Sequence, residues 1–133
     1  MKKLFAFVTV LGLLLPNFAL AADDGVPRIT KEELRAKMVK GENVIVLDVR
    51  VKGSYEGSKV KIKGSLRISP DEIEAKYKDL PQDREIITYC TCTNEHTSAR
   101  VARILMDKGF KNVKALLGGF SAWVEAGYPT EPK

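Results

Sequence analysis

Residues 85–105 read EIITYCTCTNEHTSARVARIL and change from a strand pattern to a helix pattern. Residues 85–89 are mostly β-branched or aromatic, which predicts a strand. Residues 97–108 place apolar side chains at helical spacing, which predicts an amphipathic helix. The polar segment between them contains both cysteines of the chain, Cys90 and Cys92. The stretch therefore predicts a strand, a loop with two thiols and a helix in direct succession.

The rest of the chain repeats this alternation of strands and helices. Further strand patterns cover residues 44–49 and 113–117, and further helices are expected to begin at Thr30, Ser69 and Phe120. Residues 52–63 are rich in Gly, Ser and Lys, which favours a long surface loop. Strands that alternate with helices are typical of an α/β fold with a mostly parallel sheet.

The N-terminal segment has the pattern of a secretory signal peptide. A positively charged start is followed by an apolar run over residues 4–15 and by a small-x-small cleavage pattern that ends at Ala21. The run is shorter than the roughly 20 residues that a membrane-spanning helix needs. We therefore expect a signal peptide at 1–21, cleaved after Ala21 or Ala22, and a single mature domain at 22–133. The expected location is periplasmic or secreted, with no stable membrane insertion after cleavage.

The charge of the mature chain is mild. Without Lys2 and Lys3, 20 basic residues stand against 17 acidic ones, and the net charge falls from +5 to +3. Both signs are interspersed along the chain, so nothing indicates a nucleic acid partner. The two cysteines are separated by one residue and cannot join distant segments as a structural disulfide does. Their presence in an exported chain therefore points to reactivity.

The chemistry of this loop favours a reactive thiolate at Cys92. Reactive groups in open α/β sheets gather at the carboxyl ends of the strands. Backbone N–H groups of the loop and the positive end of the following helix would lower the pKa of the thiol. The same groups would hold a persulfide, which forms and is discharged by double displacement. The loop residues expected around the sulfur are Thr93, Asn94, Glu95, His96, Thr97 and Ser98.

Four groups of residues carry a resemblance to a known family. They are residues 46–50 (VLDVR), 62–70 (IKGSLRISP), 89–102 (YCTCTNEHTSARVA), and 118–123 (GGFSAW) with 126–129 (AGYP). In this order the mature chain resembles the rhodanese domain, a family of sulfurtransferases. The resemblance implies a three-layer α/β fold, in which a mostly parallel sheet of about five strands has helices on both faces. It also implies that sulfur passes from a small sulfane-sulfur donor such as thiosulfate to a thiol or cyanide-like acceptor, without a cofactor.

The resemblance assigns roles to particular residues. The family's six-residue loop ends directly before Ser98, so counting back makes Cys92, rather than Cys90, the catalytic cysteine. The residue matching Asp48 supports the active-site loop in the family. Arg50 is either a support or an anion-binding residue by resemblance, or a solvated surface arginine by its type.

The loop also departs from the family at two positions. Many active members have Arg where this chain has Thr93, and Gly where it has Glu95. A carboxylate that points at the sulfur would raise the pKa of the thiol. Thiosulfate, a dianion, is therefore a less secure donor than the fold suggests.

Other interpretations of the cysteines remain open. In one of them, Cys90 and Cys92 form a thiol–disulfide redox pair. In a related one, Cys90 resolves or relays a persulfide from Cys92. In another, the chain is a non-catalytic persulfide carrier, and a periplasmic redox or sulfur-carrier protein is its partner. His96, the only histidine, is a possible proton donor or acceptor near the sulfur. Its spacing from the cysteines is unusual for zinc, so no metal site is predicted. A phosphatase loop is excluded, because it needs an Arg six residues after its cysteine.

Overall fold

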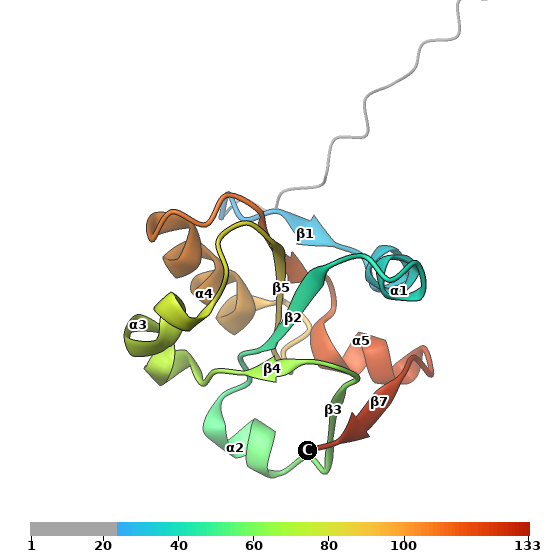
Figure 1. Ribbon diagram of the computed structural model, residues 1–133. Helices are drawn as coiled ribbons and strands as arrows, with labels where there is room; N and C mark the ends of the chain where they lie inside the picture. The colour runs from blue at the N-terminus through green and yellow to red at the C-terminus, as the bar shows by residue number, and fades with distance from the viewer. Residues whose placement is uncertain (1–23) are drawn as a thin grey trace, which may run out of the picture.

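A five-stranded sheet, parallel throughout, runs through the centre of the molecule (Figure 1). The computed structural model describes residues 24–133, so the predicted signal peptide at 1–21 lies outside the described residues. The strand order is β1 (Arg28–Ile29), β6 (Val113–Leu116), β5 (Glu85–Tyr89), β2 (Val44–Asp48) and β4 (Leu66–Arg67). Neighbouring parallel strands need crossover connections, and helices supply them.

Helices cover both faces of this sheet. They are α1 (Lys31–Val39), α3 (Ile73–Lys76), α4 (His96–Asp107) and α5 (Gly119–Glu125). A further short helix, α2 (Lys52–Glu56), contributes no buried residue. Strand β2 shows the division, because Ile45 and Leu47 join the core that contains α3 and α4, whereas Val46 joins the core that contains α1 and α5. This alternation is the period of a strand that is buried on both faces. The predicted three-layer α/β fold is confirmed.

The pairing of β2 with β5 positions the reactive loop. Asp48 and Tyr89, the last residues of these strands, are register partners. The chain continues from Tyr89 into Cys90, and α4 begins six residues later at His96. The amphipathic face of α4 packs Val101 and Leu105 into the core, each with no exposed surface. The strand and the helix on either side of the cysteines are therefore both anchored.

The segment 52–63 was wrongly predicted as a loop. It contains α2 and the strand β3 (Val60–Ile62), which pairs antiparallel with β7 (Thr130–Pro132) in a second, two-stranded sheet. The side chain of Ile62 is completely buried. The partner of β3 lies near the end of the chain, so its local composition carries no sign of the pairing. The two-residue strands β1 and β4 escaped prediction because they are too short to show a period.

The helix expected after Ser69 is broken into three short parts. These are the 3₁₀ turn Pro70–Glu72, α3 and the 3₁₀ turn Tyr77–Asp79. Ile73 is fully buried and Tyr77 packs against the same core, so the predicted apolar face of the segment is present. No helix within residues 24–133 has the length and apolar character that crossing a membrane requires.

Candidate active site

The two cysteine sulfurs lie side by side at the carboxyl edge of the sheet. Sγ of Cys90 is 3.0 Å from Sγ of Cys92. Cys90 is only 1% exposed, whereas Cys92 is half-buried and borders the solvent. The sulfur of Cys92 is therefore the one that an incoming molecule can reach.

The surroundings of the two thiols shift their pKa values in opposite directions. Burial raises the pKa of Cys92, but hydrogen bonds from the Cys90 thiol and from the backbone N–H and hydroxyl of Thr97 outweigh it and leave the pKa lowered. The hydroxyl oxygen of Thr97 lies 3.9 Å from the Cys92 sulfur. Burial raises the pKa of Cys90, although the Ser98 hydroxyl lies 3.5 Å from its sulfur. The pair is thus arranged so that Cys92 loses its proton at a lower pH than Cys90.

Glu95 occupies the loop in a backbone conformation that glycine favours. Its φ is +55°, and it is the one non-glycine residue with a positive φ among the described residues. The carboxylate is 5% exposed and accepts hydrogen bonds from Nε of Arg28 at 2.9 Å and from the N–H of Gly118 at 3.2 Å. The negative charge that the sequence placed near the sulfur is therefore matched by a buried guanidinium.

The Gly118–Gly119 turn packs against the backbone of the cysteine loop. Gly119 has a φ of +62°, and a Cβ atom there would lie 2.6 Å from the carbonyl oxygen of Cys90 and 2.8 Å from that of Cys92. The N–H of Phe120 donates to the carbonyl of Cys90 at 2.8 Å. This close approach of two backbone segments requires glycine at position 119.

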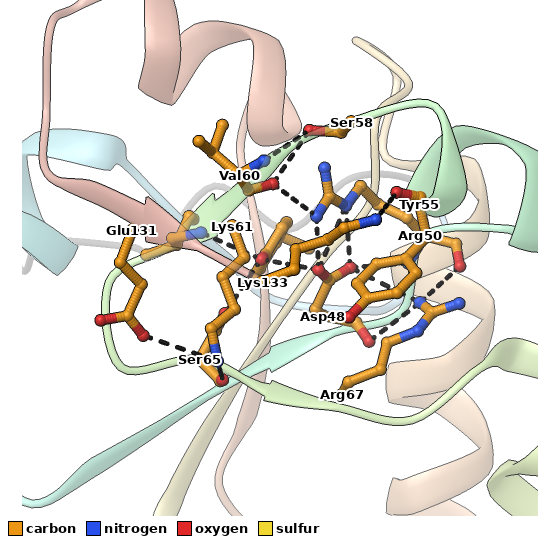
Figure 2. A network of polar contacts seen from close by, with 12 residues as sticks. Asp48, Arg50, Tyr55, Ser58, Val60, Lys61, Ser65, Arg67, Glu131 and Lys133 are labelled. Carbon is orange, nitrogen blue, oxygen red and sulfur yellow. Dashed lines mark hydrogen bonds and ion pairs between the residues drawn. The ribbon is translucent and has the colours of Figure 1, made fainter.

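A buried ion pair lies under the neighbouring strand ends (Figure 2). Asp48 has no exposed surface and accepts from Nε of Arg50 at 3.0 Å, from its terminal nitrogen at 2.7 Å and from the hydroxyl of Tyr89 at 2.9 Å. Burial, followed by the charge of Asp48, raises the pKa of Tyr89, so its hydroxyl stays a donor.

Arg50 is held in this network and does not face the solvent. It is 1% exposed, and its guanidinium lies 4.3 Å from the centre of the Phe120 ring. The interpretation of Arg50 as a solvated surface arginine is therefore wrong. The network contacts the backbone of Cys90 through two residues. Tyr89 directly precedes Cys90 in the chain, and the N–H of Phe120 donates to the carbonyl of Cys90.

The structure brings together some of the predicted loop residues and separates others. The sulfur of Cys92 lies beside that of Cys90, and the hydroxyls of Thr97 and Ser98 lie close to the two sulfurs. Thr93 and Asn94 are exposed on the loop. His96 is exposed too and lines a shallow pocket of about 270 Å³ beside α4, a pocket whose lining does not include either cysteine. Within residues 24–133 the imidazole of His96 forms no hydrogen bond with either cysteine sulfur.

Sequence reasoning missed Arg28 as a residue of this site. It lies on the two-residue strand β1 and reaches Glu95 across 67 positions of the chain. The sequence around Arg28 and the sequence around Glu95 give no indication that these two residues pair. Across the described part of the chain, no group of three or more His, Cys, Asp or Glu side chains is placed to hold a metal ion.

Comparisons with known proteins place this geometry in a family. A family model described as the rhodanese-like domain matches residues 30–126. The thiosulfate sulfurtransferase GlpE of Coxiella burnetii is 31% identical over 94 residues, which are 71% of this chain and 83% of that protein. A sulfurtransferase of Allochromatium vinosum is 28% identical over 104 residues, which are 78% of this chain and 94% of that protein.

Solved structures agree with these relatives. A rhodanese-related protein from Thermoplasma volcanium has a TM-score of 0.68 and 27% identity, covering 80% of this chain and 98% of its own. The rhodanese-like domain of the Anabaena sp. Alr3790 protein has a TM-score of 0.69 and 26% identity, covering 80% of both chains. With its fold, its strand–cysteine–helix loop and its relatives in agreement, this chain belongs to the rhodanese-like domain family.

Proposed function

We propose that the chain is a sulfurtransferase that moves sulfane sulfur through a persulfide on Cys92. The observation that carries the proposal is the half-buried Cys92 thiol, whose pKa is lowered at the start of α4 beside Thr97. The sulfurtransferases among the relatives support the same general chemistry. Thiolates rather than thiols are the nucleophiles in such reactions.

The proposed reaction has two displacements at sulfur. The Cys92 thiolate attacks the sulfane sulfur of a donor. The S–S bond that joins this sulfur to the rest of the donor breaks, and the first product leaves with the bonding electrons. Cys92 then carries a persulfide anion. An acceptor thiolate or cyanide attacks the outer sulfur in the second step, and the Cys92 thiolate returns. The hydroxyl and N–H of Thr97 stabilise the negative sulfur before and after each step.

We propose that the preferred donors carry no more than a single negative charge on the reacting sulfur group, as the persulfide group of a low-molecular-weight persulfide does. A dianion such as thiosulfate is best held by a bidentate guanidinium. Arg50 is committed to Asp48, and Thr93 has no charge to offer. Thiosulfate is thus expected to load Cys92 more slowly than a persulfide of glutathione.

Mass spectrometry of the reduced protein after exposure to each donor tests the site and the chemistry together. The mature chain is expected to gain one sulfur on the peptide that contains Cys92, and Cys92→Ser is expected to gain none. A Cys92→Ser protein that takes up sulfur like the wild type would overturn the proposal. Repeated turnover from thiosulfate or persulfide to cyanide separates an enzyme from a carrier, because a carrier loads once and stops.

We also propose that the chain acts outside the cytoplasm, in the periplasm or after secretion. The charged and apolar pattern of residues 1–21 supports this location. A periplasmic redox or sulfur-carrier protein would then be the partner that receives or supplies the sulfur. Cell fractionation and the intact mass of the exported protein test the proposal. A full-length chain that stays in the cytoplasm would contradict it.

A further inference from the structure

In the proposed double displacement the Cys90 thiol serves only as a hydrogen-bond donor to Cys92, yet its sulfur lies beside the reacting atom. Its distance of 3.0 Å from Sγ of Cys92 is within van der Waals contact of two sulfurs. A disulfide needs a sulfur–sulfur distance of about 2.05 Å. Forming that bond therefore requires the two sulfurs to approach each other by roughly 1 Å.

We propose that Cys90 resolves the persulfide on Cys92, so that the chain also releases sulfane sulfur as hydrosulfide. This inference rests on the proposed persulfide at Cys92. Sγ of Cys90 attacks the inner sulfur of the persulfide and forms the Cys90–Cys92 bond. The bond between the inner and outer sulfur breaks, and the outer sulfur leaves with its electron pair. The outer sulfur is thereby reduced to sulfide, and the two cysteine sulfurs are oxidised to a disulfide.

The proton of the Cys90 thiol completes the balance of this step. Burial raises the pKa of Cys90, so its thiol remains protonated while it waits beside the persulfide anion. The proton passes first to the outer sulfur of the persulfide, which leaves Cys90 as the attacking thiolate, and the outer sulfur then departs as HS⁻. No other acid, oxidant or reductant is needed for a single turnover.

The burial of Cys90 explains why it acts on Cys92 and not on external donors. It is 1% exposed, and its backbone carbonyl is held by the N–H of Phe120 at 2.8 Å. Its sulfur contacts Ser98 on one side and Cys92 on the other. A donor molecule in solution therefore meets Cys92 first, and Cys90 meets only the sulfur that Cys92 has accepted.

The two fates of the persulfide would then compete. An external acceptor attacks the outer sulfur and restores the Cys92 thiolate, whereas Cys90 attacks the inner sulfur and leaves a disulfide. A dithiol reductant restores both thiols of the disulfide by thiol–disulfide exchange. Over a complete cycle the chain would reduce sulfane sulfur to sulfide at the expense of a dithiol.

A single-turnover experiment without added thiol tests this inference. The reduced mature protein is loaded with glutathione persulfide, freed of small molecules by rapid gel filtration, and followed by intact mass and by free sulfide. The wild type is expected to lose the added sulfur and two hydrogens, to release about one sulfide per chain, and to give a peptide with a Cys90–Cys92 disulfide. Cys90→Ser, the matched variant, is expected to keep the added sulfur and release none.

The outcomes separate this inference from the proposed function. If the wild type and Cys90→Ser both keep the added sulfur, Cys90 does not resolve the persulfide, and sulfur transfer through Cys92 stands. Equal sulfide release by the two proteins would also overturn the inference. If neither protein gains sulfur, the persulfide itself is wrong, and the inference falls with it. Disulfide mapping in the wild type keeps the test decisive even where Cys90→Ser folds poorly.

Discussion

Nε of Arg28 lies 2.9 Å from Oε1 of Glu95 and joins the first strand of the sheet to the active-site loop. Both side chains are less than 10% exposed. The left-handed backbone of Glu95 is unfavourable by about 1–2 kcal/mol for a residue with a Cβ atom. The ion pair and the N–H of Gly118 hold the residue there in spite of this strain. The loop thus uses a buried carboxylate as an anchor at a position whose backbone conformation favours glycine.

Replacing Arg28 is expected to disturb both the stability and the reactive thiol. Arg28→Met leaves the buried carboxylate of Glu95 without its counter-charge, which lowers the free energy of unfolding by about 3–5 kcal/mol. The uncompensated charge near the loop also raises the pKa of Cys92. Urea unfolding and the pH profile of Cys92 alkylation measure the two effects.

A neighbouring lysine supplies the control for this prediction. Lys31 pairs with Glu32 at 3.1 Å on the surface, with side chains 33% and 59% exposed. Lys31→Met is expected to change stability by less than about 1 kcal/mol and to leave the alkylation profile in place. Equal effects of the two substitutions would show that Glu95 does not depend on its buried partner.

Gly119→Ala is expected to disrupt the support of the cysteine loop. The added Cβ would meet two carbonyl oxygens of the loop at less than 3 Å, in a backbone conformation that alanine already disfavours. Gly41 shares the positive φ but has nothing within 4 Å of the position of a Cβ, so Gly41→Ala measures the backbone strain alone.

The difference between these two variants isolates the clash. Strain alone is expected to lower the free energy of unfolding by about 1–2 kcal/mol in Gly41→Ala. Gly119→Ala is expected to lose more than this and also to lose persulfide formation at Cys92, because the loop must move. Urea unfolding and sulfur loading check both results, and equal stability losses with full loading would contradict the proposed support.

The sequence predicted the central part of this site because its information is local. Strand β5 matches its predicted residues 85–89, and α4 begins within one residue of the prediction. The choice of Cys92, with Thr97 and Ser98 beside it, came from the six-residue loop that the family resemblance implies before the helix. Arg28 and the β3–β7 pair escaped prediction because their contacts join segments that are far apart in the chain.

The role of Glu95 escaped prediction for a related reason. Its residue type suggested a negative charge beside the sulfur. Only the position of β1 reveals that the guanidinium of Arg28 pairs with this carboxylate. Arg50 was equally ambiguous, because an arginine at a strand end is solvated in many proteins and is buried here.

The reactivity of Cys92 is expected to depend on the hydroxyl of Thr97. The thiolate fraction of a cysteine grows as the pH rises through its pKa, so a lowered pKa moves the midpoint of alkylation to lower pH. Thr97→Val keeps the shape of the side chain but removes the hydroxyl, and the midpoint is expected to move to higher pH. Thr97→Ser keeps the hydroxyl and is expected to retain the midpoint of the wild type. Peptide mass spectrometry follows Cys92 separately from Cys90, and identical midpoints in all three proteins would refute the role of the hydroxyl.

Asp48→Asn is expected to be among the most destabilising single changes near the site. The substitution leaves Arg50 as a cation that is 1% exposed and has lost its counter-charge, which lowers the free energy of unfolding by about 3–5 kcal/mol. Glu72→Gln breaks the ion pair with Lys76, whose side chains are each about half exposed, and is expected to change stability by less than about 1 kcal/mol.

A second substitution separates the lost charge from lost packing around Asp48. Arg50→Met combined with Asp48→Asn removes the stranded cation and keeps an apolar side chain over the Phe120 ring, where the guanidinium lies 4.3 Å from the ring centre. Because an unpaired buried charge is the main penalty in the single variant, the double variant is expected to recover part of the stability. Urea unfolding of the two variants decides the matter. A double variant less stable than Asp48→Asn would mean that the hydrogen bonds of Arg50 to Asp48 and Val60 outweigh the cost of its buried charge.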